Sequence, residues 1–220
     1  MFKYKLFVLI LIITGIFCFK TIYADNNELS LIGKVIYIDP GHGGVDPGAL
    51  YKNVYEADIN LDISKKISDI LTSRGGVVYL TRDGNYDLSL PGASARKRSD
   101  LSRRANIIND SMCDIYVSIH LNAESTGIWS GAQVFYDDIN PQNKLIAEIM
   151  QQRLSKDLKT DRKYKEIKDM YLHKRVKRPG VLVEVGFISN ASERYLLMKD
   201  SYRQKAALSI ANGIEEYLTK

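Results

Sequence analysis

Four polar residues stand where apolar runs of the chain end or are interrupted. His42 follows IYIDPG, Glu56 lies in NVYEADIN, His120 ends VSIH, and Glu184 interrupts VLVEVGF. Two neutral imidazoles and one carboxylate make the three-ligand set of a catalytic zinc site, whose fourth position is left open for water. We therefore expect His42, Glu56 and His120 to bind one Zn²⁺ ion and Glu184 to act as the general base.

Short β-branched runs alternate with longer stretches of helical spacing, which is typical of an α/β fold. We predict a single domain with a mostly parallel, twisted sheet that is flanked by helices on both faces, each strand being buried on both sides. The predicted strands cover residues 34–39, 77–81, 114–120, 131–136 and 181–185. Helices are predicted over 99–109, over 142–158, where Leu145, Ile149 and Leu154 recur, over 202–218, and along the stripe Ile59, Ile63, Ile67, Ile70 and Leu71.

These elements would position the four residues at one edge of the sheet. In open α/β sheets, ligands bind beyond the carboxyl ends of the strands, and His42 and His120 both lie at such ends. Glu56 is expected at the start of a helix, where the helix dipole favours a carboxylate. Glu184 lies inside a predicted strand, where an ionised group is costly unless a cation or a hydrogen bond is close.

Each of these residues also has an ordinary structural explanation. His42 lies in a glycine-rich loop that could form a tight turn or an anion-binding nest, but the Lys-Ser/Thr ending of a phosphate-binding loop is missing. Taken alone, His120 is more often a core histidine, and Glu56 a helix N-terminal acid. However, the chain has only three histidines, and two occupy strand ends. His173, in the basic segment YLHKR, is expected at the surface.

The N-terminal segment 1–24 is interpreted as a signal peptide, or as an anchor that is retained uncleaved. Lys3 and Lys5 precede an apolar core over residues 6–19, and Tyr23-Ala24 resembles a cleavage site. We therefore expect export across the cytoplasmic membrane. Only Cys113 would remain after cleavage, so no internal disulfide is expected.

The charge of the chain gives no reason to expect nucleic-acid binding. Removing the three lysines of segment 1–24 leaves +2 of the +5 charges. The basic clusters 96–98, 103–104 and 174–178 are expected to be solvated. The cluster 96–98 has a second interpretation as a contact for an acidic peptide and glycan. Trp129 with Phe135 or Tyr136 could stack on sugar rings, although burial is the commoner fate of such aromatic residues.

Four blocks of the sequence resemble the zinc-dependent N-acetylmuramoyl-L-alanine amidases of the amidase-3 type. These blocks are IYIDPGHGGVDPGA, YEADINLDIS, VSIHLNA and VLVEVGFISN, and they occur in the family's order. The resemblance implies a catalytic domain over residues 34–220, zinc ligands at His42, Glu56 and His120, and a catalytic carboxylate at Glu184. It also implies hydrolysis of the amide between N-acetylmuramic acid and the L-alanine of the stem peptide on peptidoglycan strands.

The insert 83–98 and the run WSGAQVFY further resemble the spore-cortex members of this family. There, a separate deacetylase converts the product toward the muramic-δ-lactam that germination needs. The resemblance implies action at the cell wall or in the forespore intermembrane space. Because no wall-binding module is expected, an accessory exported protein is a further hypothesis.

Two alternatives to the amidase remain open at this point. A zinc peptidase that cuts within the stem peptide could use the same ligands and the same base. A noncatalytic peptidoglycan-binding domain could keep the fold without turnover, although Glu184 beside a full ligand set argues against it.

Overall fold

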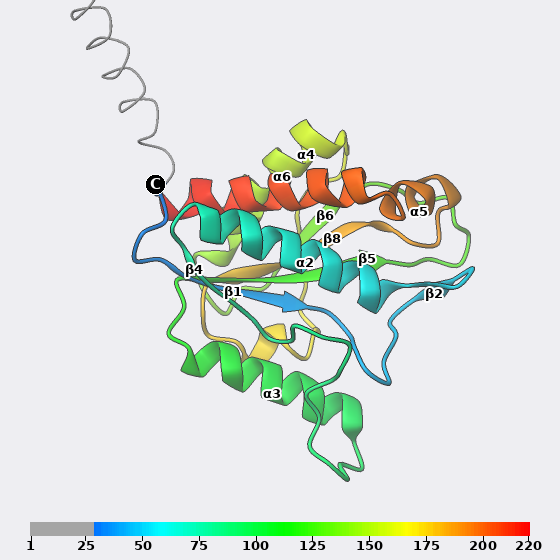
Figure 1. The fold of residues 1–220 in the computed structure, drawn as a ribbon, viewed down its shortest axis with the longest axis horizontal. Helices are drawn as coiled ribbons and strands as arrows, with labels where there is room; N and C mark the ends of the chain where they lie inside the picture. The colour runs from blue at the N-terminus through cyan, green and yellow to red at the C-terminus, as the bar shows by residue number, and fades with distance from the viewer. Residues whose placement is uncertain (1–28) are drawn as a thin grey trace, which may run out of the picture.

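A six-stranded sheet forms the centre of the computed structural model, which describes residues 29–220 (Figure 1). Its strands are β1 (Val35–Pro40), β4 (Val77–Leu80), β5 (Ile115–Asn122), β6 (Gln133–Tyr136), β7 (Lys165–Glu166) and β8 (Gly180–Phe187). They lie in the order β4-β1-β5-β8-β6-β7. β6 runs antiparallel to β8, whereas the other neighbouring strands pair in parallel. The predicted mostly parallel α/β sheet is confirmed.

Helices cover both faces of this sheet, as predicted (Figure 1). One face carries α2 (Glu56–Ser73), α4 (Asn143–Leu158) and α6 (Asp200–Leu218), with α6 packed between the other two. The opposite face carries α3 (Arg96–Asp110) and the short 3₁₀ helix η1 (His173–Arg175). A further short helix, α5 (Ala191–Leu197), follows β8 and leads into α6. No helix of the described range 29–220 is long and apolar enough to cross a membrane.

The alternation of side chains along each strand separates the two faces. On β5, every second residue joins the large apolar core beneath α2, α4 and α6: Ile115, Val117, Ile119 and Leu121. The residues between them, Tyr116, Ser118 and His120, point to the α3 side. The same alternation on β8 sends Val181, Val183 and Val185 into the large core and Glu184 to the α3 side.

Some elements differ from the sequence-based predictions. β4 lies at the edge of the sheet, so Val77 and Tyr79 are 44% and 50% exposed, and the prediction that every strand is buried on both sides is wrong for β4. On α4, Leu145 faces solvent, because Ile146 and Met150 supply the buried stripe instead. The hairpin β2 (Leu50–Tyr51) with β3 (Val54–Tyr55) was not predicted, since two-residue strands carry no periodicity. The predicted signal segment 1–24 lies outside the described residues.

Candidate active site

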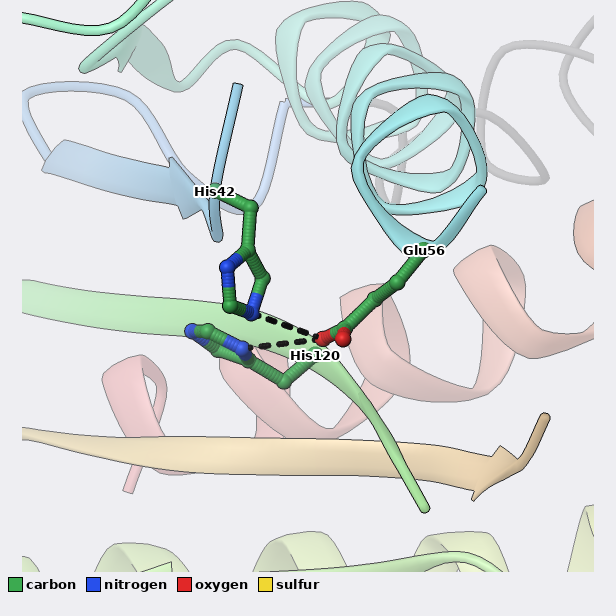
Figure 2. Close-up of side chains that lie close together, drawn as sticks. All are labelled: His42, Glu56 and His120. Atoms are coloured by element: carbon green, nitrogen blue, oxygen red, sulfur yellow. Dashed lines mark hydrogen bonds and ion pairs between the residues drawn. The ribbon is translucent and has the colours of Figure 1, made fainter. Parts of the chain in front are cut away.

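His42, Glu56 and His120 converge at the carboxyl ends of β1 and β5 (Figure 2). Glu56 Oε1 lies 3.2 Å from His42 Nε2 and 3.1 Å from His120 Nδ1. The three potential ligand atoms all lie within 4.8 Å of one another. They are also the only His, Cys, Asp or Glu cluster of this kind among residues 29–220. The structure therefore brings the three predicted ligands together.

The backbone around His42 is shaped for close packing. His42 itself has a φ of 62°, which is uncommon for a residue with a side chain and is often found at functional sites. A Cβ on Gly41 would stand 2.2 Å from His120 Cε1, so the His120 ring lies directly against that glycine. At Gly48, with a φ of 68°, a Cβ would come within 2.8 Å of both His42 and Glu56. Glycine at both positions lets the two imidazoles and the carboxylate meet.

Glu56 is the first residue of α2, and backbone donors fix its carboxylate. The Ala49 N–H donates to Oε2 at 2.8 Å, and the Leu121 N–H donates to Oε1 at 3.0 Å. The Asn60 side chain adds a third donor at 3.3 Å. Although burial alone would raise the pKa of Glu56, the two histidines hold that pKa well below its usual range. Glu56 is therefore ionised, as a carboxylate that binds a metal must be.

Asp46 orients the His42 ring from the side opposite Glu56. Its Oδ2 lies 3.0 Å from His42 Nδ1, which leaves Nε2 facing Glu56. A carboxylate in this position fixes the tautomer and ring orientation of a ligating histidine. Burial lowers the pKa of His120, despite the opposing effect of Glu56, so this imidazole is neutral and able to coordinate a cation.

Two buried arginines hold the loop that carries His42. Arg82 donates to the carbonyl oxygens of Pro40 at 3.0 Å and Gly41 at 2.9 Å. Arg104 donates to those of Pro40 and His42, both at 2.7 Å. The bonds to these carbonyls support the loop conformation through two guanidinium groups that stay charged at neutral pH.

The environment of Arg104 corrects one prediction. The cluster 103–104 was expected to be solvated, but Arg104 is 1% exposed and forms ion pairs with Asp39 at 2.8 Å and Asp100 at 2.9 Å. Arg103 is exposed, as predicted. Helical geometry separates the two neighbours by roughly 100° around α3, and only one of them faces the sheet. The doublet alone could not show which.

Glu184 lies on β8 beside His120, its Cα partner across the sheet. Burial and the nearby Glu56 carboxylate raise the pKa of Glu184 to about 8, and Oε2 has no hydrogen-bond partner in the described protein. A cation at the neighbouring ligands would favour the ionised form and lower this pKa again. An unpartnered carboxylate next to potential metal ligands can serve as a proton acceptor.

These groups line one cavity of about 360 Å³. Its walls include the ligand candidates and Glu184, the start of α3 with Lys97, and the segment from Met170 to His173. The cavity lies on the α3 side of the sheet, where the alternation of β5 and β8 directs His120 and Glu184. All four residues predicted to do chemistry therefore face one space.

His173 also lines this cavity, and its predicted surface position is wrong. The residue is 1% exposed, and its Nδ1 lies 2.8 Å from the Tyr116 hydroxyl. Lys174 and Arg175 follow it and are exposed, so the segment is basic on its outer side only. The composition of the segment hid a buried histidine because the short turn of η1 points successive residues in different directions.

The aromatic residues near the second histidine block divide between surface and core. Trp129 is 53% exposed, and Arg162 lies over its ring at 5.2 Å from the centroid. Tyr136 is buried in the main core, which is the commoner position of such aromatic residues. Of the predicted candidates, Trp129 thus keeps an accessible ring, whereas Tyr136 contributes to packing.

Comparison with known proteins gives consistent matches over nearly the whole described chain. A sequence model of the N-acetylmuramoyl-L-alanine amidase family matches residues 36–216. The germination-specific N-acetylmuramoyl-L-alanine amidase of Bacillus subtilis (strain 168) is 42% identical over 214 residues, which cover 93% of this chain and 90% of the relative.

Solved structures show the same likeness. The CwlD amidase from Clostridioides difficile, determined in complex with the GerS lipoprotein, superposes with a TM-score of 0.81 at 37% identity, covering 85% of this chain and 99% of that chain. The catalytic domain of the CwlV amidase from Bacillus (Paenibacillus) polymyxa var. colistinus gives a TM-score of 0.75 at 30% identity, covering 84% and 98%.

Proposed function

The chain belongs to the N-acetylmuramoyl-L-alanine amidase family, and we propose that it hydrolyses the amide between N-acetylmuramic acid and the L-alanine of the stem peptide. The resemblance stated from the four sequence blocks is thereby confirmed. The observation that carries the proposed reaction is the convergence of His42, Glu56, His120 and Glu184 on one cavity.

The residues present fit a zinc ion. Two imidazole nitrogens and one carboxylate oxygen make a ligand set that suits catalytic Zn²⁺, and their atoms lie close enough together to share one ion. His42, Glu56 and His120 would hold it. When bound, zinc supplies Lewis acidity at the substrate carbonyl and lowers the pKa of water.

Residues of the chain transfer the proton and position the ligands. Glu184 accepts a proton from the attacking water and delivers it to the departing nitrogen of L-alanine. A carbon–oxygen bond forms at the lactyl carbonyl, and the carbon–nitrogen bond breaks. The products are a free lactyl carboxylate and a stem peptide with a free amine. Arg82, Arg104 and Asp46 act indirectly, since they hold the loop and ring of His42 in place.

The relatives support a more specific setting for this reaction. The Bacillus subtilis relative is named germination-specific, which favours spore-cortex peptidoglycan as the substrate here. We propose that a deacetylase then acts on the product on the way to muramic-δ-lactam. Action outside the cytoplasmic membrane follows from such a substrate, with segment 1–24 as the export signal or anchor.

An accessory exported protein is part of this proposal. The Clostridioides difficile CwlD amidase was solved in complex with a lipoprotein, GerS, and it covers most of this chain. A lipoprotein partner would bring the enzyme to a membrane-adjacent substrate. Whether the purified chain needs one is decided by measuring its activity with and without extract from sporulating cells.

Product analysis tests the proposed reaction. Purified cortex peptidoglycan is digested with the zinc-loaded protein, and the soluble fragments are identified by mass spectrometry. We expect intact stem peptides that begin with L-alanine, and none in the matched digest with Glu184→Gln. Shortened peptides that lack L-alanine would instead identify a peptidase. Zinc-loaded protein that releases no peptide, even with the extract added, would indicate a binding domain.

A further inference from the structure

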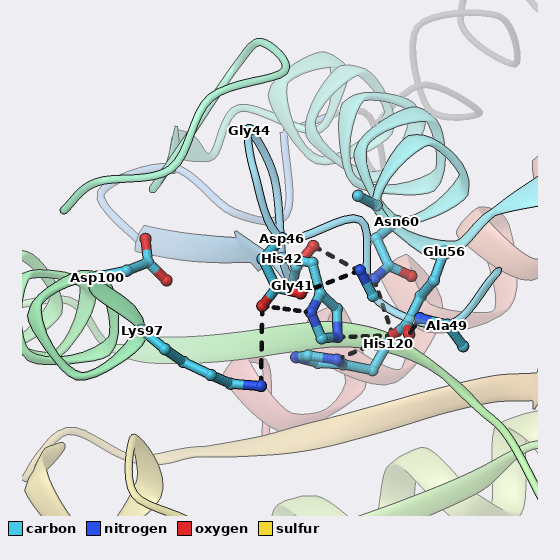
Figure 3. Close-up of polar contacts among 12 residues, drawn as sticks. Gly41, His42, Gly44, Asp46, Ala49, Glu56, Asn60, Lys97, Asp100 and His120 are labelled. Atoms are coloured by element: carbon cyan, nitrogen blue, oxygen red, sulfur yellow. Dashed lines mark hydrogen bonds and ion pairs between the residues drawn. The ribbon is translucent and has the colours of Figure 1, made fainter. Parts of the chain in front are cut away.

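Three consecutive basic residues begin α3, and they make different contacts. Arg96 forms an ion pair with Asp87 at 2.8 Å. The Arg98 guanidinium lies over the Tyr171 ring, 5.6 Å from its centroid. Lys97, between them, points toward the loop that carries His42 (Figure 3). Helical geometry therefore directs one residue of the three toward the proposed reaction site.

Lys97 lines the cavity but is only loosely held there. Its Nζ lies 3.8 Å from Asp46 Oδ2, which is too long for a hydrogen bond, and its side chain is 72% exposed. No other ion pair of Lys97 occurs within the described part of the chain. The ammonium group thus keeps donors that are free to bind a ligand.

The remaining charges of the cavity make Lys97 distinctive. Arg104 is the other Lys or Arg side chain among the described lining residues, but it is 1% exposed and already paired with Asp39, Asp100 and backbone carbonyls. The other charged groups on the walls include the carboxylates of Asp46, Glu56 and Glu184. Zinc held by His42, Glu56 and His120 would act at the scissile carbonyl. Away from that position, Lys97 is the free side-chain cation of the described lining that can attract an anionic part of the substrate.

The substrate chemistry indicates which part that is. In the uncleaved substrate, the lactyl carboxyl group is bound in the amide, and N-acetylated sugars carry no charge. Carboxylates therefore belong to the stem peptide. Asp46 Oδ2 lies 3.8 Å from Lys97 Nζ and 3.0 Å from His42 Nδ1, so the ammonium is at most about 7 Å from the His42 ring. About two residues span this distance, at roughly 3.8 Å per residue.

We infer that Lys97 is a specificity-determining residue that binds a carboxylate of the stem peptide, one residue beyond the L-alanine. The inference rests on the proposed amidase function and names the peptide side of the cavity. In this inference, the cavity wall formed by the start of α3 contacts the stem peptide that the reaction releases. Lys97 is a substrate-binding residue in this account and takes no part in the proton transfers.

Two muropeptides that differ in a single group test this assignment. Both carry N-acetylmuramoyl-L-alanine, and the second stem residue bears either a free carboxylate or a carboxamide. We expect the wild-type protein to prefer the carboxylate by about 5-fold in kcat/KM, as for a partly exposed ion pair, mainly through KM. Lys97→Gln should remove this preference by raising KM for the carboxylate substrate while the zinc content stays at the wild-type level, whereas Lys97→Arg should retain it. High salt should weaken it in the wild type.

Arg103→Gln is the matched control, because Arg103 is an exposed cation of the same helix and does not line the cavity. Its preference should equal that of the wild type. A Lys97→Gln variant that still discriminates as strongly as the wild type would overturn the inference, and so would a wild type without preference. If zinc-loaded wild type cleaves neither muropeptide, even with the extract from sporulating cells added, the proposed function itself fails.

Discussion

The two faces of the sheet differ in what they bury. Beneath α2, α4 and α6 lies a continuous core of aliphatic side chains contributed by every second residue of β1, β5 and β8. On the α3 side, the apolar cluster is small, centred on Ile108, Tyr116 and Leu172. Buried polar groups such as Asp39, Arg104 and His173 share that side.

This difference teaches how one strand can serve both stability and chemistry. Because side chains alternate, β5 contributes Ile119 to the core and His120 to the cavity, and neither role constrains the other. Glu56 is contributed differently, since it is the first residue of α2, a helix of the opposite face. Substitutions on the two faces should therefore have separable effects on stability and on the site.

Arg104→Ala is expected to have the largest effect of these substitutions, destabilising the α3 side of the sheet. It leaves Asp39 buried without its cation and frees the carbonyl of His42, while the Pro40 carbonyl keeps only its bond from Arg82. We expect unfolding free energy to fall by about 3–5 kcal/mol, the usual cost of removing one partner of a buried pair. Zinc affinity should fall with it. Arg103→Ala, at the exposed neighbour, should change stability by less than about 0.5 kcal/mol in urea unfolding.

Ile210→Ala tests the opposite face. Ile210 is a fully buried residue of α6 in the large core, and it does not line the cavity. We expect a loss of about 3 kcal/mol from the lost burial and the cavity left behind. Bound zinc and kcat, measured where the variant is still folded, should match the wild type. Leu208→Ala, an exposed position of the same helix, serves as the control. A large fall in kcat would show that the faces are coupled.

Acid should weaken the α3 side through Asp39. Burial alone would raise the pKa of Asp39, but Arg104, Thr81 and Ser118 lower it to about 2 from 3.8. Since the folded pKa is depressed, its stabilisation is complete above about pH 5 and is lost as pH falls toward 2. Over this range the loss corresponds to about 2 kcal/mol. With metal removed by a chelator, the difference in unfolding free energy between wild type and Asp39→Asn should narrow by this amount between pH 5 and 2. A difference that stays constant with pH would show that Asp39 is not the source of the acid sensitivity.

The predicted strands, the main helices and the clustering of His42, Glu56 and His120 could be found from the sequence because their signals are local. Apolar runs locate the strands, and strand ends locate His42 and His120. The burial of Arg104 and His173 could not be predicted this way, because each is buried against a partner that is distant in sequence. Arg104 pairs with Asp39, and His173 contacts Tyr116. Charge doublets and basic composition indicate solvation on average, but tertiary packing decides each residue.

Zinc content and peptide release, measured together for three proteins, test the central claim most directly. The claim is that His120 belongs to the metal site and Glu184 to the proton transfer. We predict one zinc per chain in the wild type and in Glu184→Gln, with peptide release reduced by at least about 100-fold in that variant. His120→Ala should lose both zinc and release. Full release by Glu184→Gln, or one tightly bound zinc in His120→Ala, would contradict the account.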